Sequence, residues 1–281
     1  MMKKLVLFAA LLLCSFASCR AYELPEIPER IKSQEGRVDY LCKKYWKGFD
    51  FSASSPDEQT VVDFLTLVSM SSEKASLKGI KSFYRKSRPY PESLSEVSEI
   101  IEKYLYDKYS PLYDEALFEC FLKRDGSPRA RYLLDQISNN RAGTKAADFS
   151  YFTRDGYRLK LSDNFMKSEL LLLIFYDADC ENCKAMFEEF AASKSLSSAC
   201  LTDRLEVLAV DVSAEASQWF QKDQTIPECC DDAMLADNDF FSAGKYLFKA
   251  MPALYLLDKD GTVLIKDALI PEIQYFIDNH K

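Results

Sequence analysis

The sequence predicts an all-α helical domain over residues 20–141, followed over residues 142–281 by an α/β domain with a mixed sheet flanked by helices. Two observations predict this division. Between residues 28 and 142, apolar side chains recur at helical spacing behind proline-containing helix starts. Beyond that point the pattern changes to alternation, and residues 170–176 form a continuous apolar run, typical of a strand buried on both faces. With 281 residues, 48% of them hydrophobic, the chain can build both cores.

The first residues have the pattern of a signal peptide, which we assign to residues 1–18. Lys3 and Lys4 precede an apolar run over residues 5–14, and small residues lead to Cys19. The run is shorter than the roughly 20 apolar residues that cross a bilayer. Residues 16–19, Phe-Ala-Ser-Cys, resemble a bacterial lipobox, which implies a diacylglycerol on the sulfur of Cys19 and a membrane anchor. Cleavage after Ala21 without lipidation is the alternative.

Composition excludes several classes of function. The single histidine, His280, is the penultimate residue, so a Ser-His-Asp hydrolase and a two-histidine zinc site are disfavoured. The eight glycines are scattered, without the close pairs of a phosphate-binding loop. Residues 142–281 carry 14 Lys and Arg against 24 Asp and Glu. Because nucleic acids are bound by clustered cations, we expect no nucleic-acid partner.

The helical domain should contain about six helices joined by short loops. Their predicted locations are residues 30–45, a segment from the capping box Ser55-Pro56-Asp57-Glu58 to Met70, residues 73–84, residues 91–106, and two segments opened by Ser110-Pro111 and Ser127-Pro128. Its aromatic residues fall at helical spacing and are expected in the core: Tyr45, Trp46, Phe49, Phe64, Tyr104, Tyr106 and Phe118. Cys42 and Cys120 lie in the same apolar stripes and are expected to be buried.

The second domain should begin with a β-hairpin, formed by residues 147–152 and 157–161 around an Arg154-Asp155-Gly156 turn. The remaining elements are predicted as strands at residues 170–176, 205–212, 252–257 and 262–266, and helices at residues 184–192, 214–222, 240–248 and 271–279.

This order of elements, with a Cys-x-x-Cys motif directly after the first buried strand, resembles the thioredoxin fold. The resemblance is closest to extracytoplasmic thiol-disulfide oxidoreductases of the TlpA and ResA type, which carry an added N-terminal β-hairpin. Three segments carry it: Ala147-Asp148-Phe149 with its Asp155-Gly156 turn, the motif Asp179-Cys180-Glu181-Asn182-Cys183-Lys184, and Met251 to Asp258 ahead of Gly261. The whole arrangement is similar to lipoproteins common in Bacteroidota that place a helical domain of unknown function before such a module.

The resemblance is consistent with the chemistry of the motif. A cysteine at a helix start directs its sulfur at unpaired backbone N–H groups and the positive end of the helix dipole, which stabilise thiolate. Cys180 is therefore the predicted nucleophile, and Cys183, one helical turn later, the predicted resolving thiol. The resemblance further implies that Pro252 is cis and that the backbone of Met251 pairs with a substrate chain beside the cysteines.

Two departures from the thioredoxin pattern affect the expected activity. Asp179 stands where thioredoxins carry Trp, and Ile174 replaces the buried acid that assists the second thiol. The carboxylates of Asp177, Asp179 and Glu181 also surround the nucleophile and favour its protonated form. We therefore expect a low reduction potential and action as a reductant.

Other uses of the cysteines are weaker alternatives. Structural zinc would need two further ligands. The adjacent Cys229 and Cys230 are the nearby candidates, and adjacent cysteines chelate poorly compared with a second Cys-x-x-Cys motif. Peroxiredoxins need Pro and Thr seven and three residues before the reactive cysteine, where this chain has Leu173 and Asp177. Cys200, Cys229 and Cys230 either pack inertly or relay disulfides to the motif, and the adjacent pair should lie in a loop or helix start.

The sequence thus predicts a thiol-disulfide oxidoreductase of the cell envelope, periplasmic or at the outer membrane. Its expected partners are envelope proteins with cysteines or disulfides, a membrane electron donor and the lipid anchor at Cys19. We expect no cofactor and no bound metal. The alternative is a non-catalytic binding lipoprotein that uses the same module as a scaffold.

Overall fold

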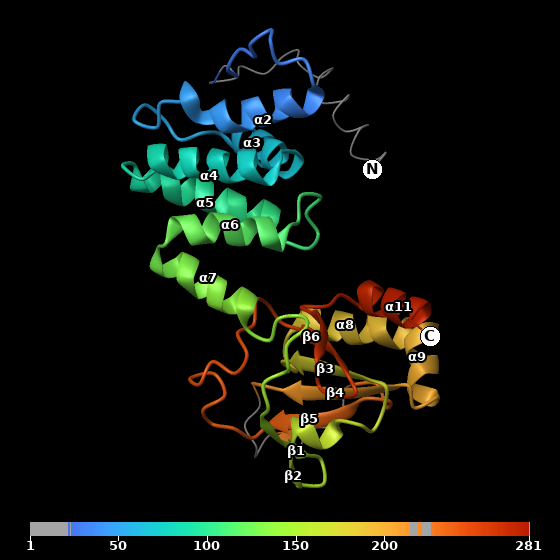
Figure 1. The fold of residues 1–281 in the computed structure, drawn as a ribbon. Helices are drawn as coiled ribbons and strands as arrows, with labels where there is room; N and C mark the ends of the chain where they lie inside the picture. The colour runs from blue at the N-terminus through green and yellow to red at the C-terminus, as the bar shows by residue number, and fades with distance from the viewer. Residues whose placement is uncertain (1–21, 23, 214–218, 221–225, 281) are drawn as a thin grey trace. The chain divides into compact units, whose positions relative to one another are not determined.

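The computed structural model describes residues 22, 24–213, 219–220 and 226–280 (Figure 1). Its contacts divide the chain between Arg131 and Tyr132 into two compact units, whereas the sequence predicts a boundary at residues 141/142. The predicted signal peptide, Cys19 and most of the predicted helix at 214–222 lie outside the described residues.

Residues 24–138 form six α-helices, as the sequence predicts. They are α2 (Gln34–Lys44), α3 (Glu58–Met70), α4 (Glu73–Ser87), α5 (Pro91–Leu105), α6 (Glu115–Asp125) and α7 (Pro128–Ser138), with a short 3-10 helix η1 (Tyr45–Lys47) after α2. The division between the two units falls within α7.

Two predicted helix starts are wrong, because aspartates cap the helices in place of the earlier serines. Helix α3 begins after Asp57, whose carboxylate accepts a hydrogen bond from the Thr60 N–H at 2.7 Å. Helix α6 begins after Asp114, which accepts in the same way at 2.9 Å, and Ser110-Pro111 lies in the turn before it. Carboxylates at a helix start gain from the helix dipole, which favours them there. The third predicted start, at Ser127-Pro128, is confirmed.

The predicted aromatic core of the helical unit is confirmed. Trp46 is fully buried, with four phenylalanine rings 5.1 to 5.5 Å from its own: Phe49, Phe51, Phe64 and Phe83. Tyr104 is only partly buried and donates a hydrogen bond to Glu58. Cys42 is buried as predicted, and burial raises the pKa of its thiol to about 11, while Cys120 is half-exposed. These ring contacts show that the aromatic cluster forms the packed core of the helical unit.

The second unit contains a seven-stranded mixed sheet in the order β2-β1-β5-β4-β3-β6-β7. The strands are β1 (Ser150–Thr153), β2 (Arg158–Lys160), β3 (Leu170–Tyr176), β4 (Leu205–Asp211), β5 (Asp231–Leu235), β6 (Ala253–Asp258) and β7 (Val263–Lys266). Strands β3, β4 and β5 are parallel, and the others pair antiparallel. The predicted hairpin and the predicted central strand are thus confirmed.

Alternate residues of β3 divide the core into two layers, one on each face of the sheet. Leu172 and Ile174 pack with α8 (Glu181–Ala192), α9 (Lys194–Leu201) and α11 (Ile270–Asn279), the helices that lie beside the sheet in Figure 1. Leu173 and Phe175 pack on the other face, with the hairpin, the 3-10 helix η2 (Leu161–Asn164) and the turns that carry Phe240 and Tyr246. The strand is buried on both faces, which explains its unbroken apolar run.

The helix predicted over residues 240–248 is wrong, because turns over residues 240–244 lead into a stretch without regular secondary structure. Gly244 has a φ of +63° in the left-handed region, which ends any helix there. Side chains fix the rest of the segment: the Asn139 amide donates to the Gly244 carbonyl at 3.0 Å, and the Asn140 amide donates to the Lys245 carbonyl at 2.8 Å. Phe240 and Tyr246 are buried in the core and Phe248 packs against it, whereas Phe241 is exposed, so three of the four aromatic residues pack without a helix.

Strand β5 and helix α9 were not predicted. Cys229 and Cys230 lie in a turn directly before β5, so the expected loop is confirmed and the helix start is wrong. The strand opens with two aspartates, which are uncommon in strands. Its second aspartate, Asp232, is buried because Arg154 and Tyr176 hydrogen-bond to its carboxylate.

Candidate functional site: two cysteines at the start of a helix

Cys180 is the N-cap residue of helix α8, as the motif predicts. After β3 ends at Tyr176, a turn closed by a hydrogen bond from the Cys180 N–H to the Asp177 carbonyl, at 3.1 Å, brings the chain to the helix. The Cys180 carbonyl then accepts the first helical bonds, from Cys183 and Lys184. As the N-cap residue, Cys180 lies at the positive end of the helix dipole. Its thiol is partly exposed and therefore within reach of solvent.

Cys183 lies one turn further along and differs from Cys180 in burial. Its side chain is 1% exposed and packs in the core layer formed by α8, α9 and α11. Burial raises the pKa of the Cys183 thiol to about 12, and a side-chain hydrogen bond with Cys180 raises it further, while a hydrogen bond from the Asp177 backbone lowers it. Both cysteines are free thiols in this structure. The motif therefore pairs an accessible sulfur with a buried one.

The acidic side chains of the motif are partly neutralised. Lys184 forms an ion pair with Glu181 at 2.7 Å, and both side chains are exposed. Asp177 accepts a hydrogen bond from the Asp179 N–H at 2.8 Å through a side-chain oxygen. Ile174 is fully buried in the same core layer as Cys183, so apolar atoms occupy the position where thioredoxins keep their buried acid.

The Met251–Pro252 peptide bond is cis, which confirms the isomer that the resemblance implied. Strand β6 pairs antiparallel with β3 and brings Ala253 opposite Phe175. Continued by one residue, this register places Pro252 across from Tyr176, the last residue before the motif turn. Met251 and Cys180 also pack against the same core layer. The four predicted site residues therefore lie around one end of the sheet.

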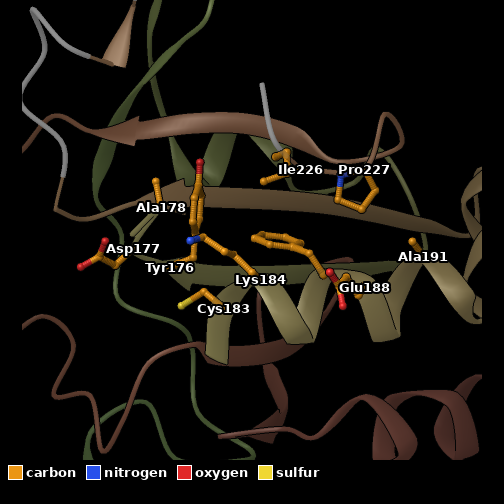
Figure 2. Close-up of a pocket in the computed structure, with 10 residues that line it drawn as sticks. Tyr176, Asp177, Ala178, Cys183, Lys184, Glu188, Ala191, Ile226 and Pro227 are labelled. Atoms are coloured by element: carbon orange, nitrogen blue, oxygen red, sulfur yellow. The ribbon is translucent and has the colours of Figure 1, made fainter. Parts of the chain in front are cut away.

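A hollow of about 500 Å³ opens on the Cys183 side of the motif, and we name it the α8 pocket (Figure 2). Its lining residues are Tyr176, Asp177, Ala178, Cys183, Lys184, Phe187, Glu188, Ala191, Ile226 and Pro227. Figure 2 shows Ile226 and Pro227 across the hollow from the residues of α8. Cys180, Met251 and Pro252 are not among the lining residues. The pocket is therefore separate from the edge at Met251 and Pro252, where a substrate chain is expected to pair.

No local sequence pattern predicts that Cys200, Cys229 and Cys230 cluster. The Cys229 thiol makes side-chain hydrogen bonds with both of the others. The β4–β5 register places Cys230 beside Val207, which is four residues, or about 13 Å, from the strand end that carries the motif. This register places Cys230 away from the strand end that carries the motif, which argues against a zinc site or a direct relay joining the two groups of cysteines. No metal-binding group of three His, Cys, Asp or Glu side chains occurs within the described ranges.

These features define the class: the second unit is a thioredoxin-fold module with a Cys-x-x-Cys pair at the start of a helix. Residues 142–265 match the model of the AhpC/TSA family, and residues 9–124 match a domain of unknown function, DUF5106. The predicted combination of a thioredoxin-like module with a helical domain of unknown function is thus confirmed. No curated protein matches the chain.

Among solved structures, the chain is similar to a thioredoxin-like protein from Bacteroides caccae. The two share 25% identity with a TM-score of 0.73, over 94% of this chain and all of the other. A conserved protein of unknown function from Bacteroides fragilis is 29% identical over 49% of this chain and 98% of its own, with a TM-score of 0.46. A thiol:disulfide interchange protein from Bacteroides sp. is 17% identical over 50% of this chain and 89% of its own, with a TM-score of 0.41.

Where the structure describes the chain, none of the helices has the length and apolar character that a bilayer span requires.

Proposed function

We propose that this protein is an extracytoplasmic thiol-disulfide oxidoreductase that exchanges disulfides with envelope proteins through Cys180 and Cys183. The observation that carries the proposal is the pairing of a partly exposed thiol at a helix N-cap with a buried thiol one turn away, hydrogen-bonded to it. This asymmetry suits an attacking and a resolving sulfur.

As a reductant, the pair would act in two steps. The Cys180 thiolate attacks one sulfur of a substrate disulfide, forms a mixed disulfide and releases the other substrate sulfur as a thiolate. Cys183 then loses its proton and attacks the Cys180 sulfur, which releases the second substrate thiol and leaves a Cys180–Cys183 disulfide. The substrate gains two electrons and two protons. A membrane electron donor would return the pair to its dithiol form.

The cis-proline edge would hold the substrate chain. In this proposal the Met251 backbone pairs with an extended substrate segment, and Pro252 shapes the edge because it carries no N–H donor. A lipid on Cys19 would keep the exchange at the membrane surface, in the periplasm or at the outer membrane.

Trapping in cells that express the full chain tests the proposal. Cys183→Ser should accumulate mixed disulfides between Cys180 and envelope proteins, because the resolving thiol is gone. Adding Cys180→Ala should abolish every such complex. Cys183→Ser with Cys120→Ser is the matched control: Cys120 is a half-exposed thiol of the other unit, and its loss should leave the complexes unchanged.

Two results would overturn the exchange function. One is the absence of any Cys180-dependent complex together with failure of the purified chain to reduce insulin. The other is rapid consumption of hydrogen peroxide by Cys180 without exchange, which would make the protein a peroxidase. If neither chemistry occurs, and deletion of residues 20–141 removes binding to an envelope partner, the module serves as a scaffold of a binding lipoprotein.

A further inference from the structure

A second group of cysteines lies outside the motif, at the other end of the same core layer. Cys200 is half-exposed in the last turn of α9, and Cys229 is exposed in the turn before β5. Both line one hollow of about 510 Å³, together with Glu206 and Asp231. The Cys229 thiol makes side-chain hydrogen bonds with Cys200 and with the buried Cys230. Cys200 and Cys229, from two distant parts of the sequence, therefore face one solvent-accessible hollow, and Cys230 is buried beside them.

Backbone geometry selects which two of the three can join. In disulfides the Cα atoms usually lie 4.4 to 6.8 Å apart. Neighbouring residues such as Cys229 and Cys230 are held about 3.8 Å apart by a trans peptide bond, which is too close for ordinary disulfide geometry. Cys200 belongs to a separate element, so its contact with Cys229 is free of that restriction. Cys230 is also 3% exposed and closed to an incoming reagent.

We infer that Cys200 and Cys229 form a second redox site, a dithiol that low-molecular-weight disulfides such as oxidised glutathione convert to a disulfide. The Cys229 thiolate attacks the reagent disulfide, binds one half as a mixed disulfide and releases the other half as a thiol. Cys200 then loses its proton and attacks the Cys229 sulfur, which releases the second half. The reagent gains two electrons, which the formation of the Cys200–Cys229 bond supplies, and two protons, which the two thiols lose.

Burial assigns the roles of the sulfurs. Burial raises the pKa of Cys200 to about 12 and also raises the pKa of Cys230, so both thiols stay protonated at neutral pH. Cys229 is the exposed member and reacts first. Leu201, beside Cys200, is 86% exposed, so the helix end offers little cover to the mixed disulfide.

The new bond would act on a segment that the motif also uses. It would tie α9 to the turn at residues 226–230, whose Ile226 and Pro227 line the α8 pocket beside Cys183. The register places the turn before β5 about 13 Å along the strands from the end that carries the motif. Oxidation at the second site can therefore be measured with the motif removed.

The test uses the full chain with Cys180→Ser and Cys183→Ser, equilibrated with reduced and oxidised glutathione, quenched with acid, alkylated and digested with trypsin. Cys200 lies in peptide 195–204, and Cys229 and Cys230 both lie in peptide 223–245. We expect the two peptides to become linked as the share of oxidised glutathione rises. Cys230→Ser should keep the link, whereas Cys229→Ser should lose it. Cys200→Ser should instead accumulate glutathione on Cys229.

Three outcomes would overturn the inference. The first is an internal disulfide in peptide 223–245, which would show that Cys229 joins Cys230. The second is a link that survives Cys229→Ser. The third is that peptides 195–204 and 223–245 both stay reduced in buffers that fully oxidise the Cys180–Cys183 pair of the parent chain. Cys120, as a half-exposed thiol of the helical unit, provides the internal reference for unspecific glutathione addition, and its labelling should not change between variants.

Discussion

The high pKa of Cys183 predicts that resolution of a mixed disulfide at Cys180 is slow at neutral pH and accelerates with rising pH. Burial raises this pKa from 9.0 to about 12, which makes ionisation of the thiol about 4 kcal/mol harder. At pH 8 the thiolate fraction falls to about 1 in 10,000, against about 1 in 10 for an ordinary thiol. Only the thiolate attacks, so the rate should rise about tenfold per pH unit between pH 8 and pH 11.

The same shift sets the direction of the stability effect. The pKa of Cys183 in the folded chain lies above its unfolded value. The contribution of this thiol to the free energy of unfolding is therefore fully present below pH 9 and is lost as pH rises towards 12. Kinetics must therefore be measured where the chain is still folded. Formation of the mixed disulfide removes the Cys180 thiol that hydrogen-bonds to Cys183, yet burial, the largest cause of the shift, remains.

The assay follows one tryptic peptide, residues 168–184, which contains both cysteines. A glutathione mixed disulfide is formed at Cys180 at low pH, the solution is jumped to the test pH, and samples are quenched with acid. The peptide changes from the glutathione adduct to the internal disulfide. A rate that is independent of pH, or that levels off below about pH 10, would refute the reasoning, because the thiol would then ionise far more readily than its burial allows.

Two variants sharpen the test. Asp177→Asn removes a negative charge that raises the pKa of Cys183 but keeps a side-chain oxygen for the Asp179 N–H, so resolution should become faster at every pH below the plateau. Glu189→Gln removes a charge from an exposed position on the same helix and should leave the rate unchanged. Equal acceleration in both variants would show that general surface charge, and not the immediate surroundings of Cys183, controls the step.

Three further predictions concern the stability of each unit. Gly261→Ala should cost about 2 to 4 kcal/mol, because Gly261 has a φ of +77° and a Cβ there would overlap the Phe165 ring. Asp232→Ala should cost about 3 to 5 kcal/mol, because it removes a buried carboxylate that accepts from the Tyr176 hydroxyl at 2.7 Å. Asp114→Ala should cost about 1 kcal/mol through loss of the α6 cap.

Urea unfolding with peptide-resolved hydrogen exchange measures these changes, because it reports each unit separately. Gly143→Ala is the control for Gly261: it shares a left-handed backbone but has open space around the added Cβ, so an equal loss would remove the overlap as a cause. Asp260→Ala, at an exposed turn, should change stability by less than about 0.5 kcal/mol. Asp114→Asn keeps a capping oxygen, and an effect as large as that of alanine would contradict the cap.

The sequence predicts those parts of the fold whose signals are local. The apolar run at residues 170–176 gave β3 residue for residue, and the cysteine after it was correctly placed at the start of a helix. Strand β5 carries no such signal, because the partners that allow Asp232 to be buried, Arg154 and Tyr176, lie 78 and 56 residues earlier in the chain. Likewise, Cys200 and Cys229 come together only when α9 and the turn before β5 pack on neighbouring strands. No local pattern contains either contact.

Cys180 and Cys183 lie one helical turn apart but differ in burial, since Cys180 is partly exposed and Cys183 is buried. The turn after β3 leaves the first sulfur partly exposed at the helix end, while the second faces the core beneath α8. Their thiol hydrogen bond raises the pKa of the buried member, so each protonation state of the pair depends on both sulfurs. With Ile174 in place of an acid, no carboxylate at that position can remove the second proton, and release of substrate should be the slow step. A slow second step lengthens the life of the mixed disulfide, which is the species that the Cys183→Ser trap is designed to capture.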